Sequence, residues 1–277
     1  MAGRLKPIGE LFSATWERYK RRALPILAVI LLSSLVAFAV ALGVGFGLVQ
    51  AFGGLQAFAP MFQGGGLPPS PSAIFAVLAG LVLVGTLFGL WSQSAIMAAA
   101  VLDEVGVLEA MRVGYRRMWS VAWVLFLVSA ILMAGTVALV FPAILFGVWF
   151  AFGVVVLFAE ERRGLDALFA SRAYVRGHWW AVFGRLLLIG LLSGALGLVP
   201  VVGQLLSLLF TPFFLLFLVV LYENLQEAAG GAAEPEGRRL VWGGIAAAGA
   251  LLPLAGMAAA VAPQWPMIMQ GLQGKAV

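Results

Sequence analysis

The sequence predicts an all-α fold, namely an integral membrane helical bundle with a six-helix core of three repeats and an appended seventh span. Composition is the first reason, because 63% of the 277 residues are hydrophobic and only 10% are charged. Soluble globular domains contain about 45–50% apolar and about 25% charged residues, so this chain cannot cover its surface with polar groups in water. The other reasons are seven apolar stretches of membrane-spanning length and three similar basic segments that precede pairs of them.

Each predicted span reaches the roughly 20 apolar residues that a helix needs to cross a bilayer. The stretches that we expect to span are 23–49, 73–102, a pair that starts at Trp119 and ends at Ala159, 179–199, 202–222 and 241–262. The pair is expected to turn within Gly135–Pro142. Pro212 is expected to kink the sixth span, because proline removes a hydrogen bond from the helix interior.

The spans divide the chain into three parts. Residues 1–227 form a six-span membrane domain, residues 228–240 a cytoplasmic linker, and residues 241–277 the seventh span with a short outer tail. The linker contains the flexible stretch AAGGAAEPEG. Because the number of spans is odd, the two termini are expected on opposite sides of the membrane.

Lysine and arginine predict the orientation of the chain. They cluster before the first span and in the segments that follow the second, fourth and sixth spans, whereas only Lys275 falls on the opposite face. Loops rich in these residues stay on the cytoplasmic side, so we expect the N-terminus in the cytoplasm and the C-terminus outside. A cleaved signal peptide is not expected, since the first apolar run is too long and no small-x-small site closes it.

An internal repeat precedes the first, third and fifth spans. The three segments read ELFSATWERYKRRALPIL, EAMRVGYRRMWSVAWVL and DALFASRAYVRGHWWAVF, and each passes from an acid to basic and aromatic residues. Residues that share one face recur at helical spacing, as in Leu11, Phe12 and Thr15 or Trp16, in Leu108, Met111 and Tyr115, and in Leu165, Leu168, Phe169 and Val175. This pattern predicts amphipathic helices near 8–22, 104–118 and 162–178 that lie in the cytoplasmic interface of the bilayer.

The stretch SRAYVRGHWWAVFGRLLL, a proline in a later span and a closing LYENL resemble a bacterial family of polytopic membrane proteins. The family is related to the membrane domain of glycerophosphoryl diester phosphodiesterases and includes the YciC-like proteins. The resemblance covers roughly residues 5–227 and implies an inner-membrane domain. The phosphodiesterase activity of the fused catalytic domain is not carried over, because this chain has one histidine and no soluble region of barrel length.

His178, the one histidine of the chain, is the strongest candidate for a catalytic or metal-binding group. A zinc site needs three or four ligands, and the chain has no second histidine and no cysteine. Histidine beside two tryptophans is typical of the aromatic belt at the headgroup level. We therefore predict no catalytic residue, no metal and no cofactor, and we interpret four residues as interfacial anchors, namely Trp119, His178, Trp179 and Trp180.

Nine arginines are candidates for contact with lipid headgroups or another anion. They are Arg18, Arg21, Arg22, Arg112, Arg116, Arg117, Arg172, Arg176 and Arg185. Orientation by the positive-inside rule explains most of them without any specific ligand. Arg185 lies about two turns into the fifth span, where its long stem can raise the guanidinium to the headgroups, or where it can serve a functional site.

Small residues four apart occur in three spans, at Gly43/Gly47, Gly85/Gly89 and Gly190/Gly194. Such spacing permits close helix approach, and packing within the chain is preferred here over dimerisation. The scattered intramembrane hydroxyls, among them Ser33 and Thr86, are expected to form hydrogen bonds within and between helices. No Asp, Glu or Lys lies in mid-membrane, which argues against an ion-coupled transporter.

The sequence therefore favours a non-enzymatic inner-membrane protein with a structural, accessory or regulatory role and contact with lipid headgroups. The partners that we expect are membrane lipids, with another membrane protein or a homo-oligomer as further candidates, and no nucleic acid. One alternative is a permease or channel for a small or lipidic substrate, with a polar cavity near Thr86, Ser129, Arg185 and Thr211. Another is a membrane enzyme acting on lipid phosphodiesters.

Overall fold

The computed structural model describes residues 5–54, 56, 59, 71–103, 105–138, 140–199, 202–230 and 239–264. Every element in these residues is helical, as predicted. In chain order the helices are α1 (Ile8–Ala51), α3 (Pro71–Val101), α4 (Val107–Ala138), α5 (Val140–Phe150), α6 (Gly153–Ala159), α7 (Leu165–Val175), α8 (Trp179–Gly197), α9 (Val202–Ala229), α10 (Arg239–Val261) and the 3₁₀ turn η1 (Ala262–Gln264).

Within the described residues, six helical stretches are long and apolar enough to cross a membrane. They belong to α1, α3, α4, the α5–α6 pair, α8 and α9, which confirms a multi-pass helical membrane protein. The third and fourth spans separate where α4 ends at Ala138 and α5 begins at Val140, inside the predicted turn. The apolar part of α10 that is described, Leu240–Leu252, is shorter, so the seventh span stays a prediction. Most of the predicted linker (231–238) and the outer tail (265–277) lie outside the described residues.

The helices divide into two compact units, which are described separately. The hairpin unit comprises the described parts of Lys6–Ala122 and Leu191–Leu221. The pocket unit comprises Leu5 and the described parts of Trp123–Gly190 and Tyr222–Val277. Helices α4, α8 and α9 each contribute residues to both units.

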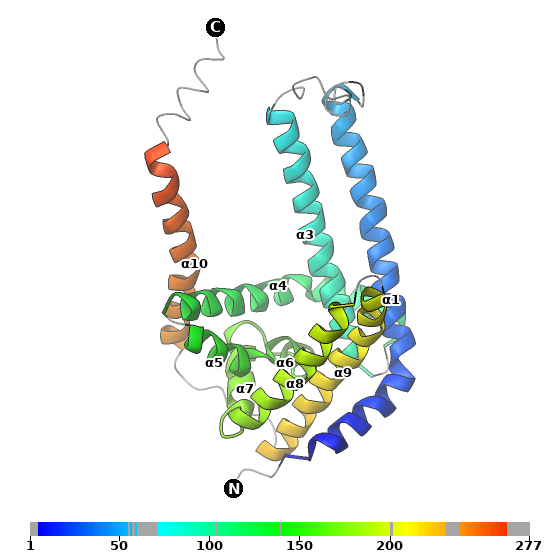
Figure 1. Ribbon diagram of the computed structural model, residues 1–277, viewed down its shortest axis with the longest axis vertical. Helices are drawn as coiled ribbons and strands as arrows, with labels where there is room; N and C mark the ends of the chain where they lie inside the picture. The colour runs from blue at the N-terminus through cyan, green and yellow to red at the C-terminus, as the bar shows by residue number, and fades with distance from the viewer. Residues whose placement is uncertain are drawn as a thin grey trace. The chain divides into compact units, whose positions relative to one another are not determined.

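In the hairpin unit α1 and α3 run side by side, and the N-terminal part of α1 bends away from this pair (Figure 1). The predicted interfacial segment 8–22 and the first span are one continuous helix with Pro25 inside it. Proline lacks the N–H that would bond one turn back, which is an ordinary cause of a bend. Ser33 in α1 and Ser92 in α3 join the two helices by a hydrogen bond of 2.7 Å between their hydroxyls, as expected for hydroxyls in an apolar setting.

The apolar stripes of two predicted interfacial helices are placed differently from the expectation. In α1, Leu11 and Thr15 are buried, and the Phe12 ring lies 5.8 Å from Phe213 and 5.3 Å from Phe217 of α9. In α7, seven residues are buried within the pocket unit, among them Leu168, Phe169 and Val175. Hydropathy periodicity identifies an apolar face, but it does not distinguish lipid from protein as the neighbour of that face.

The three pairs of small residues also differ from the expectation. An added Cβ at Gly43, Gly47, Gly85, Gly89, Gly190 or Gly194 would meet no heavy atom of the described chain within 4 Å. The close helix approaches occur at other small residues. A Cβ on Gly114 of α4 would lie 2.5 Å from the Cα of Ala95 in α3, and one on Gly135 would lie 2.9 Å from the nitrogen of Ala143.

In the pocket unit Trp242 fixes the start of α10. Its ring lies 5.4 Å from Phe146, 6.2 Å from Trp149 and 5.3 Å from Phe150, all three in α5. The Arg172 guanidinium of α7 lies over the rings of Trp149 and Trp242, at 4.7 and 5.2 Å from their centroids. Such cation–π contacts are worth about 2 kcal/mol or more when they are desolvated. Trp242 therefore attaches the start of α10 to α5 directly and to α7 through Arg172.

Replacement of that side chain tests the attachment of α10. We expect Trp242→Ala to lower the free energy of unfolding by about 3 kcal/mol or more, because a buried aromatic ring and its cation–π partner are lost together. Thermal unfolding in detergent measures the change. Leu240→Ala is the matched control, since Leu240 is 93% exposed two residues earlier. Equal melting temperatures for the two variants would contradict this account of α10.

Candidate functional site

Two of the predicted headgroup-binding arginines contact the end of α3 in the hairpin unit. Arg18 forms a two-point ion pair with Asp103, at 2.6 Å from Nη2 to Oδ2 and 3.2 Å from Nε to Oδ1. Arg22 donates to the carbonyl of Ala99 at 2.9 Å and also to those of Leu102 and Asp103. The last carbonyls of a helix have no partner within that helix, so Arg22 caps α3. Arg21 is exposed, and its Nε donates to the Glu17 carbonyl one turn earlier at 3.4 Å.

The first turns of α4 present a different arrangement, which we call the α4 stripe. It consists of Leu108, Arg112, Tyr115, Arg116 and Trp119. The three apolar members are 76%, 68% and 65% exposed, and both arginines are exposed as well. The spacing of four, seven, eight and eleven residues places all five side chains on one face of the helix.

The two arginines of the α4 stripe differ from the other basic groups in their surroundings. Within the described part of the chain, the guanidinium groups of Arg112 and Arg116 make no hydrogen bond or ion pair. Neighbouring Arg117 is half-buried and does interact within the protein. The stripe thus combines free cations with exposed aromatic rings, which is the composition of a bilayer interface anchor.

The stretch around His178 lies where α7 passes into α8. The Trp179 ring stacks on Phe183 at 5.1 Å, and its Nε1 donates to the Leu145 carbonyl at 3.4 Å. Trp180 is 74% exposed and remains a candidate interfacial anchor together with Trp119. His178 is half-buried, and among the described residues no group of three or more His, Asp and Glu side chains could hold a metal.

The remaining predicted arginines lie in α7, in the turn that follows it, and in α8. The guanidinium of Arg172 forms cation–π contacts with the rings of Trp149 and Trp242, as described above. Arg176 is exposed just after the end of α7, whereas Arg185 is half-buried in α8. Both interact within the protein.

Glu160 forms a polar cluster that the sequence did not predict. Its Oε1 accepts hydrogen bonds from the hydroxyls of Tyr174 and Tyr222, both at 2.7 Å, and its Oε2 pairs with Arg162 Nε at 2.8 Å. The Glu160 side chain is only 10% exposed. Three segments, at the end of α6, in α7 and in α9, therefore meet at one carboxylate. The sequence signal was weak, since an acid directly after an apolar span reads as a helix end.

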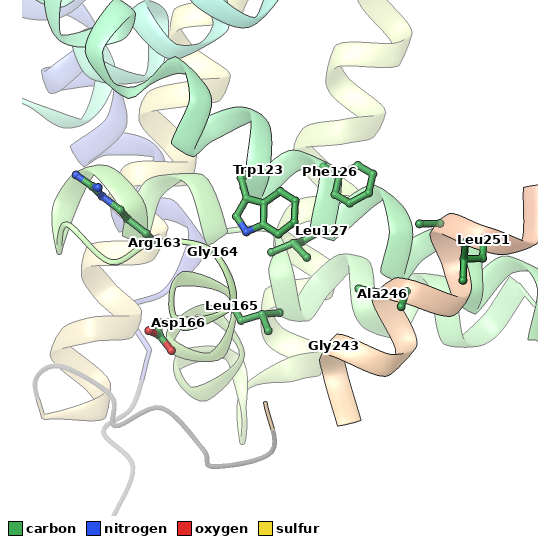
Figure 2. Close-up of a pocket in the computed structure, with 12 residues that line it drawn as sticks. Trp123, Phe126, Leu127, Arg163, Gly164, Leu165, Asp166, Gly243, Ala246 and Leu251 are labelled. Carbon is green, nitrogen blue, oxygen red and sulfur yellow. The ribbon is translucent and has the colours of Figure 1, made fainter. Parts of the chain in front are cut away.

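A second feature that the sequence did not predict is a pocket of about 710 Å³ in the pocket unit (Figure 2). Trp123, Phe126 and Leu127 of α4 form one side, and four small residues of α10 together with Leu251 form the other. The loop before α7 contributes Arg163 and Gly164, and the first turn of α7 contributes Leu165 and Asp166, at one end. Figure 2 shows Arg163 and Asp166 pointing away from the apolar walls. The lining is largely apolar, with charge confined to that end.

No protein-family model, curated protein or solved structure matches this chain. The relation to the membrane domain of glycerophosphoryl diester phosphodiesterases therefore stays a prediction from the motifs quoted above.

The assignment of Arg22 as a helix cap separates it from its neighbour Arg21. We expect Arg22→Gln to lower the free energy of unfolding by about 2 kcal/mol, because carbonyls at the end of α3 lose a charged donor. Arg21→Gln removes the same charge from an exposed position and should change it by less than about 0.5 kcal/mol. Chemical unfolding of the detergent-solubilised variants measures both values. A larger effect at Arg21 would refute the capping role.

The Glu160 cluster makes a second prediction about stability. Tyr222→Phe keeps the ring and removes one donor to a nearly buried carboxylate, so we expect a loss of about 1 kcal/mol, and the same for Tyr174→Phe. Tyr115→Phe, at an exposed tyrosine, should leave the unfolding transition unchanged. If all three variants unfold alike, the two hydroxyls contribute nothing to holding α9 against α6 and α7.

Proposed function

We propose that this multi-pass membrane protein is non-enzymatic and holds anionic lipid headgroups against the α4 stripe at the cytoplasmic face of a bacterial inner membrane. Its role is structural, accessory or regulatory. The observation that supports the proposal is that Arg112 and Arg116, which are exposed and have no side-chain partner among the described residues, share one helical face with exposed Tyr115 and Trp119.

The physical reason is the chemistry of the bilayer interface. Tyrosine and tryptophan rings favour the headgroup layer because they are apolar in body and polar at one edge. A guanidinium fork matches phosphate oxygens, and each basic residue near an anionic surface contributes about 1 kcal/mol of attraction. The stripe supplies both kinds of group within four helical turns.

The other predicted arginines are less suited to this role because their charges are already engaged. Arg18 pairs with Asp103, Arg22 caps α3, and Arg172 lies on two tryptophan rings. Each would have to give up a protein contact before it bound a headgroup. The contribution of Arg21, Arg117, Arg176 and Arg185 to lipid contact stays a prediction.

The permease alternative has less support from the hydroxyl groups that were expected to line its path. Thr86 donates to the carbonyl of Val82 at 2.8 Å, and Thr211 donates to that of Ser207 at 2.8 Å. Both hydroxyls are thus satisfied within their own helices. The pocket next to Thr211, which Ser193 and Ser207 also line, measures about 140 Å³ and is much smaller than a typical ligand site of about 300–1,000 Å³.

Removal of the two stripe charges tests the proposal. The double variant Arg112→Gln, Arg116→Gln should bind phosphatidylglycerol about 20- to 30-fold more weakly, since two contributions of about 1 kcal/mol are lost. Native mass spectrometry of the detergent-purified protein, titrated with phosphatidylglycerol and separately with phosphatidylcholine, measures the affinities. Phosphatidylcholine binding should stay unchanged.

The matched control is Lys6→Gln, Lys20→Gln, which removes the same net charge outside the stripe. It should retain the binding of phosphatidylglycerol. Equal losses in the two double variants would show that net charge alone attracts the lipid. An unchanged affinity in the arginine variant would overturn the proposed role of the α4 stripe.

A further inference from the structure

We infer that the pocket between α4, the loop before α7 and α10 binds one acyl chain of a bilayer phospholipid, with the lipid phosphate at Arg163. This site lies in the pocket unit and shares no residue with the α4 stripe. Its volume of about 710 Å³ falls within the range of about 300–1,000 Å³ that is usual for ligand sites.

The walls of the pocket fit a hydrocarbon chain. Gly243, Ala246, Ala247 and Ala250 of α10 recur at spacings of three and four residues, so their small side chains leave space along one face. The facing side is apolar and aromatic, with Trp123 and Phe126 of α4 each about half exposed. The pocket is thus open to a chain that enters from the surrounding lipid.

The length of the pocket also fits one leaflet. The α10 residues that line it extend from Gly243 to Leu251, which is about 12 Å along a helix that rises 1.5 Å per residue. The hydrocarbon core of a bilayer is about 30 Å thick, so this length is within the depth of a single leaflet. A chain held here would run along α10 with its headgroup at the end of the pocket where the loop lies.

Arg163 supplies the charge at that end. It is exposed and follows α6 by only four residues, where the fourth apolar span has just ended. Among the described residues its guanidinium has no hydrogen-bond or ion-pair partner, whereas neighbouring Arg162 is paired with Glu160. Asp166 lies in the first turn of α7, where a carboxylate is favoured by the helix dipole.

The contact between Arg163 and phosphate is the part of the binding free energy that favours a phospholipid over a lipid without phosphate. A chain that moves from the bilayer into the pocket leaves one apolar surrounding for another, so the hydrophobic effect contributes little to binding. Packing along α10 and a charge-assisted hydrogen bond to phosphate must supply the affinity, and such a bond is worth about 1.5–3 kcal/mol. A lipid without a phosphate should therefore bind more weakly.

Photocrosslinking in nanodiscs tests the inference with full-length protein. The probe is phosphatidylglycerol with a diazirine in one acyl chain, and the comparison probe is diacylglycerol with the same labelled chain. Peptide mass spectrometry should find phosphatidylglycerol attached to the α4 and α10 residues that line the pocket. Arg163→Gln should lower this labelling about tenfold or more, to the level of diacylglycerol.

A pocket-filling variant provides the second arm. Ala247→Phe should abolish pocket labelling by either probe, while Ala248→Phe, at an exposed neighbour that does not line the pocket, should leave it intact. Equal labelling of the two alanine variants would overturn the inference. Labelling spread evenly over the apolar surfaces would do the same. The double variant of the α4 stripe should not alter pocket labelling, which keeps the two proposals separable.

Discussion

The hydrocarbon core of a bilayer offers no hydrogen-bond partner, and this constraint governs the structure. Within each helix the backbone N–H and C=O groups bond one another. Polar side chains bond nearby carbonyls, both within a helix and at its end. Thr15 and Thr136 donate to carbonyls one turn earlier in their own helices, at 2.7 and 2.9 Å. In α9 the hydroxyl of Tyr19 donates to the Leu209 carbonyl at 3.0 Å, one residue after Leu208, whose carbonyl loses its helical donor because Pro212 has no N–H. Arg22 does the same for the end of α3.

The constraint also divides the basic residues into two kinds. Some are bound within the protein, to a carboxylate, to carbonyls or to aromatic rings, as in Arg18, Arg22 and Arg172. Others, such as Arg112, Arg116 and Arg163, have no such partner in the described chain and are exposed. The first kind stabilises helix contacts and the second is available to anions. From their charge alone, all six arginines named here would have been given the same role.

The sequence predicted the apolar spans, but it did not predict that the interfacial segments before the first and third spans continue into α1 and α4, and it said little about which helices meet. Apolar length predicted the six spans, and a charge-free interior predicted a multi-pass protein. Arg18 contacts Asp103 from 85 residues away, and no local pattern indicates that pairing. The same holds for Tyr174 and Tyr222 at Glu160. Periodicity located the apolar face of α7, and that face is covered by protein. The sequence could not predict this, because an apolar face has the same hydropathy whether it contacts lipid or a packed helix. The pocket arises from small residues of α10 placed opposite α4, which is a property of packing.

The pair formed by α1 and α3 is longer than the bilayer is thick. Helix α3 has 31 residues, or about 46 Å at 1.5 Å per residue, against a hydrocarbon core of about 30 Å. Such a mismatch is relieved by leaning of the helices, by local swelling of the lipid, or by sorting into a thicker membrane. The thickness of the surrounding bilayer therefore influences how far α1 and α3 lean from the membrane normal.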